Sequence, residues 1–382
     1  MRAGPIDVDY ADGELWAIRW NGHEIVRRIY PVLQDANWHV RPWIIEDEHV
    51  DADDKGFRIR VRGRGNHLAP EFTWVADING DASGCIAYEW AGSTGAPFWR
   101  NRLGLCVLLP IKGLAGKAGV VISPDGTRRD VTFPAAISPH QPFGDAVGIE
   151  FDAGAAVRID FTGDVFEAED HRNWGDASYK VYCTPIDLPR PVEVCPGDEV
   201  RQSVTLTWPV APARTPDVAG ADLIEVARDA VPLPRLGVMA APEPWTPAEA
   251  EDLAALELDH LYVILDLPGH VNALEQAAAN ARAIEARLRI ALRDGSEDDI
   301  AALAPRIRDL ADLVDVCYAF RSDEPVTSPD WIATVRDLLG PSIPVGGGTD
   351  VYFTELNRQP PERSEEHTSE LQSRVDISYA VF

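Results

Sequence analysis

The sequence predicts a multidomain protein, β followed by α/β, in which a large antiparallel β-sandwich precedes an incomplete (β/α)8 TIM barrel. The length of 382 residues corresponds to two or three domains of ordinary size. Short alternating or apolar stretches recur up to about residue 232, separated by turn signals such as Asn21-Gly22. Beyond that point strands alternate with amphipathic helices, which is typical of a parallel sheet.

The first domain, residues 1–215, is expected to be the β-sandwich. Its clearest strands are rich in β-branched, aromatic and aliphatic residues and are bounded by Gly, Asn, Asp or Pro. These strands are expected at residues 15–20, 57–61, 104–109, 156–161 and 204–208. A Pro-rich joint follows at residues 208–215, and a short helix is expected at residues 221–229.

The second domain, residues 216–362, is expected to hold the first five strands of the barrel. Strands are expected at residues 236–240, 260–267, 288–292, 314–320 and 345–348, the first of them buried. Helices are expected at residues 246–257, 273–286 and 328–339, with another that begins at Ser296. A doubly wound sheet is the alternative, but no Gly-rich phosphate loop follows the first strand.

The last segment, residues 363–382, breaks from the composition of the rest. Its string R-S-E-E-H-T-S-E-L-Q-S resembles a translated sequencing adapter and lacks the Ala and Pro that precede it. We expect this tail to be non-native rather than an ordinary polar loop, and the natural protein to be longer. Five strands would leave the barrel with an open edge, and the sequence leaves the activity of such a truncated chain open.

Composition excludes several classes of function. The net charge of −27 opposes binding to nucleic acid or to an anionic membrane surface, whereas a local Arg cluster can still hold a small anion. The five cysteines contain no C-x-x-C pair, and no histidine pair has metal-ligand spacing, so neither a metal nor another cofactor is expected. No signal segment or long apolar run is found, so a cytoplasmic location is expected.

The densest polar stretch runs from residue 166 to residue 180. It contains His171, Arg172 and Lys180, and Lys180 is one of only four lysines among 35 basic residues. A solvated loop, a polar network between the domains and a substrate-binding segment that closes over the site are all compatible with this composition. His171 and Arg172 are therefore candidate substrate-binding residues.

This stretch also carries a resemblance to a known family. The run F-E-A-E-D-H-R-N-W-G-D-A-S-Y-K-V-Y-C-T-P-I resembles the most distinctive motif of the D-apionate lactonase family. Three further segments are similar to that family: N-R-L-G-L-C-V-L-L-P, I-S-P-H-Q-P-F and F-T-E-L-N-R. The resemblance extends from about residue 10 to residue 362. It implies a β-sandwich, a TIM barrel, a further β-rich C-terminal domain that this chain lacks, and hydrolysis of a branched sugar-acid lactone in apiose catabolism.

Candidate catalytic and binding residues follow the predicted barrel strands, because barrel enzymes carry their chemistry at the carboxyl ends of their strands. These candidates are Glu243, Asp266, Arg293, Asp294, Arg321, Ser322, Asp323, Glu324, Asp350, Glu355, Asn357 and Arg358. Each acid has the alternative role of a helix cap or an exposed loop charge. Three of them, Glu324, Asp323 and Glu355, are the candidate catalytic acids, with Glu324 favoured as general base. The candidates for substrate binding are Arg321, Arg293, Glu243, Asn357, Arg172 and His171.

The reaction expected from these residues is hydrolysis of a sugar-acid lactone, a small-molecule substrate. A serine nucleophile is not supported, because the sequence has no G-x-S-x-G elbow. Two alternatives stay open. One is a retaining glycoside hydrolase on the same barrel, which needs two carboxylates ~5–5.5 Å apart. The other is a non-catalytic carbohydrate-binding protein.

Overall fold

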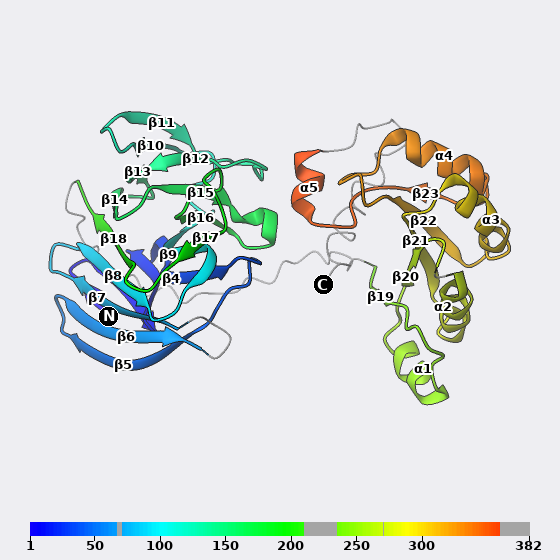
Figure 1. Cartoon of the computed structure of the whole chain (residues 1–382), viewed down its shortest axis with the longest axis horizontal. Helices are drawn as coiled ribbons and strands as arrows, with labels where there is room; N and C mark the ends of the chain where they lie inside the picture. The colour runs from blue at the N-terminus through cyan, green and yellow to red at the C-terminus, as the bar shows by residue number, and fades with distance from the viewer. Residues whose placement is uncertain (67–70, 210–234, 270, 360–382) are drawn as a thin grey trace. The chain divides into compact units, whose positions relative to one another are not determined.

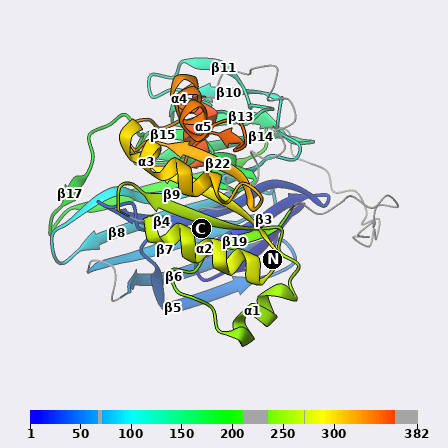
Figure 2. The same cartoon turned by 90° about the vertical axis from the view of Figure 1, so that its right-hand side faces the viewer.

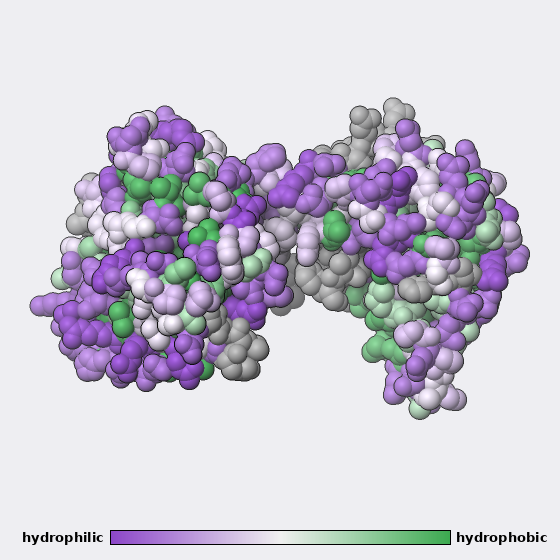
Figure 3. Space-filling model, in the orientation of Figure 1, coloured by the Kyte–Doolittle hydropathy of each residue, from purple (hydrophilic) through white to green (hydrophobic). Residues whose placement is uncertain are grey.

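The computed structural model describes residues 1–66, 71–209, 235–269 and 271–359. The chain divides into two compact units, Met1–Asp222 and Leu223–Phe382 (Figure 1). The helix expected at residues 221–229, most of the Pro-rich joint and the adapter-like tail lie outside the described residues. Figure 3 shows a mostly hydrophilic surface on the face in view, in keeping with the net charge of −27.

The N-terminal unit contains two large antiparallel sheets, each of nine strands, which we call sheet A and sheet B. The strands of sheet A, in spatial order with β17 paired to β9, are β1 (Arg2–Ala3), β2 (Ile6–Ala11), β3 (Glu14–Trp20), β4 (His23–Asp35), β9 (Phe98–Pro110), β16 (Ser178–Tyr182), β15 (Phe166–Asp170), β12 (Phe143–Ala146) and β17 (Val192–Val194). The strands of sheet B, also in spatial order, are β11 (Arg128–Thr132), β10 (Ala118–Ile122), β13 (Gly148–Asp152), β14 (Ala156–Thr162), β18 (Glu199–Thr207), β8 (Ile86–Thr94), β7 (Phe72–Gly80), β6 (Phe57–Gly65) and β5 (Trp43–Ala52).

One hydrophobic core joins the two sheets. Strand β6 shows why the sequence folds this way: Phe57, Ile59 and Val61 are buried, and the intervening arginines are exposed. Large aromatic side chains fill the core, among them Trp74 and Trp90. Each fully buried side chain of this size adds about 1.5–3 kcal/mol to the stability of the fold. The five strand segments expected from the sequence lie in β3, β6, β9, β14 and β18 and are confirmed, although β18 ends at Thr207.

The second unit contains a parallel sheet whose five described strands follow chain order. Its strands are β19 (Gly237–Met239), β20 (His260–Asp266), β21 (Arg287–Arg293), β22 (Val314–Phe320) and β23 (Val345–Gly346). Its helices are α1 (Pro247–Ala254), α2 (Val271–Ala283), α3 (Glu297–Arg308), α4 (Pro329–Leu339) and α5 (Phe353–Arg358). Helices α2, α3 and α4 pack on one face of this sheet (Figure 1; Figure 2). The alternation of strand and helix is thus as predicted, although the described strands do not close into a barrel.

The starts of three helices follow the local chemistry that the sequence indicated. Thr246 and Ser296 each form a capping box, accepting from the amides of Glu249 and Asp299 respectively. Ser328 caps α4 by accepting from the amide of Trp331. Among the described residues, no helix is both long and apolar enough to cross a membrane.

One predicted feature of this unit is wrong. The strand expected to be buried at residues 236–240 is the exposed strand β19, in which Val238 and Met239 are 36% and 48% exposed. The reason is its position: among the described strands, β19 pairs only with β20 and therefore forms an edge. The fifth strand is also shorter than expected, because only Val345 and Gly346 pair with β22.

Candidate active site

Three charged side chains meet at the carboxyl ends of the parallel strands. Asp266 and Arg293 are the last residues of β20 and β21 and face each other in register. The Nε atom of Arg293 donates a hydrogen bond to Asp266, and its Nη1 atom lies 3.7 Å from a carboxylate oxygen of Asp350. The bond to Asp266 and the charge of Asp350 raise the pKa of Arg293. The guanidinium is thereby fixed between two carboxylates.

An aromatic cluster lies on the same face of the sheet, opposite the helices. Tyr318 stacks on Phe320 with a centroid distance of 6.1 Å, and Tyr262 lies 6.2 Å from Tyr318. Burial, with the nearby Tyr318 and Asp350, raises the pKa of Tyr262 well above its ordinary value. The phenol of Tyr262 therefore stays protonated at neutral pH and can donate a hydrogen bond.

A second group of candidates lines an open hollow in the loops that follow the strands. The hollow has a volume of about 530 Å³ and is formed by the loops after β21 and β22 together with Trp331 of α4. Arg321 binds Asp323 through two hydrogen bonds of 2.9 and 2.8 Å and lies 5.1 Å from the Trp331 ring centroid. Asp294 joins the two loops, because its carboxylate accepts from the amide of Ser322 at 2.6 Å. Arg321 and Asp323 are exposed, so their pairing adds little stability.

Glu324, the favoured general base, is bound to the start of a helix. Its carboxylate accepts from the amide of Ser328 at 3.0 Å and from the hydroxyl of the same residue at 3.3 Å. Since Ser328 is the N-cap of α4, Glu324 supports the cap of that helix. This contact agrees with the capping role that the sequence offered as an alternative.

The remaining candidates of this unit are not brought together. Glu355 forms a 2.6 Å ion pair with Arg358 inside α5, the helix that also contains Asn357. Glu243 follows β19, and its backbone carbonyl accepts from Asn280 of α2 at 3.3 Å. Sequence reasoning did not single out Tyr262 or Tyr318. The signal that could have found them is the alternation of side chains along each strand, which places them on the same face as Arg293.

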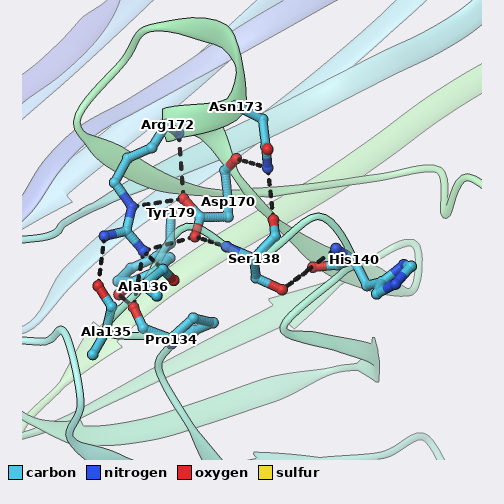
Figure 4. A network of polar contacts seen from close by, with 9 residues as sticks. All are labelled: Pro134, Ala135, Ala136, Ser138, His140, Asp170, Arg172, Asn173 and Tyr179. Carbon is cyan, nitrogen blue, oxygen red and sulfur yellow. Dashed lines mark hydrogen bonds and ion pairs between the residues drawn. The ribbon is translucent and has the colours of Figure 1, made fainter. Parts of the chain in front are cut away.

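The polar motif of the N-terminal unit forms a buried network (Figure 4). The side chain of Asp170 is fully buried and accepts from Nε and Nη2 of Arg172 at 2.9 and 2.7 Å. The same guanidinium donates to the backbone carbonyls of Pro134, Ala135 and Ala136 at 2.9–3.0 Å. Within the described part of the chain, every hydrogen bond of Arg172 therefore stays inside the N-terminal unit.

The neighbours of Arg172 extend this network along the 3-10 helix His171–Trp174. Asn173 donates to the carbonyls of Ser138 and Asp170 at 2.6 and 2.9 Å, and His171 contacts Asp176 at 3.0 Å. Figure 4 shows that Arg172 and Asn173 reach the segment around residues 134–138 from the same turn. These contacts give most of the motif's polar groups a structural role.

Among the residues that the structure describes, no group of three or more His, Cys, Asp or Glu side chains could hold a metal ion. Cys106 and Cys317 are both buried, and burial raises the pKa of each thiol.

Comparison with known proteins assigns both units to families. The family model described as D-apionate lactonase, N-terminal domain, matches residues 1–211, and that of the D-apionate lactonase TIM barrel domain matches residues 235–366. A curated D-apionate lactonase of Brucella anthropi is 28% identical over 391 residues. That alignment covers 94% of this chain and 63% of the relative, so the chain spans less than two thirds of the relative's length.

Similarity to solved structures is weak. A β-arabinopyranosidase matches with a TM-score of 0.34 and 10% identity, over 83% of this chain and 61% of its own. Galactose 1-epimerase from Lactobacillus acidophilus matches with a TM-score of 0.35 and 6% identity, over 54% of this chain and 92% of its own. At TM-scores this low, neither likeness bears on the fold or the function.

Proposed function

Because the chain belongs to the D-apionate lactonase family, we propose that it hydrolyses a sugar-acid lactone of the apionate type in carbohydrate catabolism. The observation that carries the proposal at the level of the site is Arg293, fixed between Asp266 and Asp350 at the strand ends. A cation held in this way suits both a developing oxyanion and the oxygen atoms of a hydroxy acid.

Lactone hydrolysis needs an activated water, a stabilised oxyanion and a proton for the leaving ring oxygen. In our proposal Asp350 takes a proton from water while the water oxygen bonds to the acyl carbon. Arg293 donates hydrogen bonds to the resulting oxyanion. The bond from the acyl carbon to the ring oxygen then breaks, and the proton from Asp350 passes to that oxygen. The product is the open hydroxy acid.

The other polar groups at the strand ends have supporting roles in this proposal. Asp266 is a positioning residue, because its hydrogen bond to Nε fixes the plane of the Arg293 guanidinium. Tyr262 supplies a protonated hydroxyl near Asp350 and Arg293. Glu324 stays a second candidate for the base, with Arg321 as its neighbour, although its carboxylate is bound to Ser328.

A substrate panel tests the proposal. The chain should be assayed with four- to six-carbon aldonolactones by acid release, and with nitrophenyl glycosides as a contrast. We expect lactone turnover that falls by about 10²–10³-fold in Arg293→Ala, the range seen when an oxyanion donor is lost. Arg306→Ala serves as the matched control, because Arg306 of α3 lies in an exposed ion pair with Glu275. Glycoside turnover without lactone turnover would contradict the proposal and favour the glycosidase alternative.

A further inference from the structure

Sheet A has a second, outward face that combines an apolar cluster with charged side chains and is largely shielded from solvent. Along β16, Tyr179 and Val181 face the core between the sheets, so Lys180 and Tyr182 face the other way. Lys180 is nevertheless only 7% exposed and Tyr182 is fully buried. Side chains that face away from the core yet lie this deep are recessed below their surroundings.

Lys180 is the unusual residue of this face. Among the described residues its Nζ atom forms no hydrogen bond or ion pair, and its nearest ring, Tyr182, has its centroid 6.0 Å away. The buried Nε atom of Arg102, which is 5% exposed, also lacks a partner there. A buried N–H group without an acceptor costs free energy, so the unpartnered Nε of Arg102 beside the unpaired Lys180 points to a ligand that completes this face.

The strand register places a third cation, Arg28, on the same face. Lys180 pairs with Leu108 of β9, and Leu108 pairs with Arg28 of β4, so Arg28 and Lys180 lie two strands apart, roughly 10 Å. Arg28 lies 4.0 Å from the ring centroids of Trp16 and Tyr30 and is paired with Glu14 at 2.7 Å. Arg28 is thus neutralised by Glu14, whereas Lys180 is not.

The other side of the face combines acids with aromatic rings. The guanidinium carbon of Arg102 lies 3.4 Å from the Tyr182 ring centroid, and Nη1 lies 3.7 Å from Glu169. Trp174 donates to Glu169, and Trp38 lies 5.3 Å from Arg102. Both of these indoles are exposed, by 44% and 41% respectively. Exposed indoles beside recessed charges form a rim that a small ligand can pack against.

We propose that this face binds a small polyhydroxylated carboxylate, with Lys180 and Arg102 receiving its carboxylate and Glu169 accepting from its hydroxyl groups. The indoles of Trp38 and Trp174 pack against its carbon chain. The acids on this face disfavour polyanions and suit a ligand with a single negative charge. The proposal rests on the N-terminal unit alone and does not depend on catalysis at the strand ends.

Calorimetric titration of the 382-residue chain tests this site. An Arg293→Met background removes the cation of the strand-end site, so that binding there does not contribute. The probes are D-gluconate, its uncharged counterpart D-glucitol, and acetate and inorganic phosphate as anions without a hydroxylated chain. We expect gluconate to bind at least tenfold more tightly than any of the other three.

Lys180→Met in the same background should weaken gluconate binding at least tenfold while Tm stays unchanged or rises, because the substitution breaks no ion pair among the described residues. Lys180→Arg should retain binding within about threefold, as expected when the charge is kept. Lys112→Met, a substitution of an exposed lysine, is the control. Glu169→Gln should weaken the binding of gluconate but not that of acetate. This second test does not depend on whether the Lys180→Met variant folds.

Four results would overturn the proposal. Glucitol or acetate could bind as tightly as gluconate, Lys180→Met could leave gluconate affinity unchanged, or Lys180→Met could lower Tm without affecting binding. Tighter binding of phosphate than of gluconate would show that the face does not select a polyhydroxylated carboxylate, and it would count against the proposal. Because the background lacks Arg293, each of these results is independent of the lactonase assay.

Discussion

Arg172 shows how one residue of a conspicuous motif serves the fold. Its guanidinium forms an ion pair with the fully buried side chain of Asp170. It also donates hydrogen bonds to the three successive backbone carbonyls of residues 134–136. Arg172→Ala leaves the Asp170 carboxylate buried without its charge partner. We expect the free energy of unfolding to fall by about 3–5 kcal/mol, with activity per folded molecule retained.

Urea denaturation monitored by tryptophan fluorescence measures this loss. Arg128→Ala is the matched control, because Arg128 is half-exposed and pairs with Glu150 at the surface, where such a pair is worth about 0–1 kcal/mol. Equal effects of the two substitutions would show that the Asp170 network is not a structural centre of the sandwich.

Glu167 makes the stability of the N-terminal unit depend on pH. Burial raises the pKa of its carboxyl, although the Tyr182 hydroxyl and the Ile186 amide act against this by hydrogen bonding. A carboxyl whose pKa is higher in the folded state binds protons more tightly there. Its contribution to stability is therefore present below the unfolded pKa and lost as pH rises through the folded pKa.

Glu167→Gln removes this titration. Between about pH 4 and about pH 7 we expect the stability of the wild type to fall steadily relative to that of Glu167→Gln. The reason is that only the wild type loses the stabilisation that protonated Glu167 supplies. Denaturant titrations at several pH values, carried out on both proteins, measure the difference. A difference that is constant with pH, or that moves toward the wild type, would contradict the assignment.

At the scale of single elements, the sequence predicts what depends on local chemistry. The caps at Thr246, Ser296 and Ser328 were predictable because Ser, Thr and the residues just after them decide where a helix begins. The exposure of β19 was not predictable in this way, because burial of a strand depends on which strands lie beside it. The same reason explains why Arg102 and Lys180 could not be placed on a recessed face from sequence alone.

Gly104 is one position in a strand where both the backbone conformation and a neighbouring side chain disfavour a Cβ atom. Its φ is +146°, and a Cβ there would lie 2.2 Å from Oε1 of Gln202, which accepts from the amide of Leu105 at 2.7 Å. We expect Gly104→Ala to destabilise the sandwich by about 1–3 kcal/mol through this clash.

Thermal and denaturant unfolding of the Gly104 variant measure this cost. Gly144→Ala is the control, because a Cβ at Gly144 would meet its nearest neighbour at an ordinary 3.9 Å. The control is expected to stay within about 0.5 kcal/mol of the wild type. A Gly104→Ala variant as stable as this control would show that the contact between β9 and Gln202 relaxes easily.

At the scale of the whole molecule, the change from consecutive strands to alternating strands and helices predicts the order of the two units and the type of sheet in each. Polar residues at strand ends also predict where the candidate site lies. The sequence could not show that Arg293 meets Asp266 and Asp350 while Glu324 contacts Ser328. Those pairings depend on strand register and on the course of each loop, which have no local signature.

The central claim is that hydrolysis takes place at Arg293, with Asp350 rather than Glu324 as the base. Steady-state kinetics of Asp350→Asn and Glu324→Gln on the lactone that the wild type turns over best test it most directly. We expect Asp350→Asn to lower kcat by about 10²–10⁴-fold with little change in KM, the range usual for loss of a general base. Glu324→Gln should keep kcat within a few-fold and lower only Tm. A large loss of kcat in Glu324→Gln, with Asp350→Asn near wild type, would contradict the account.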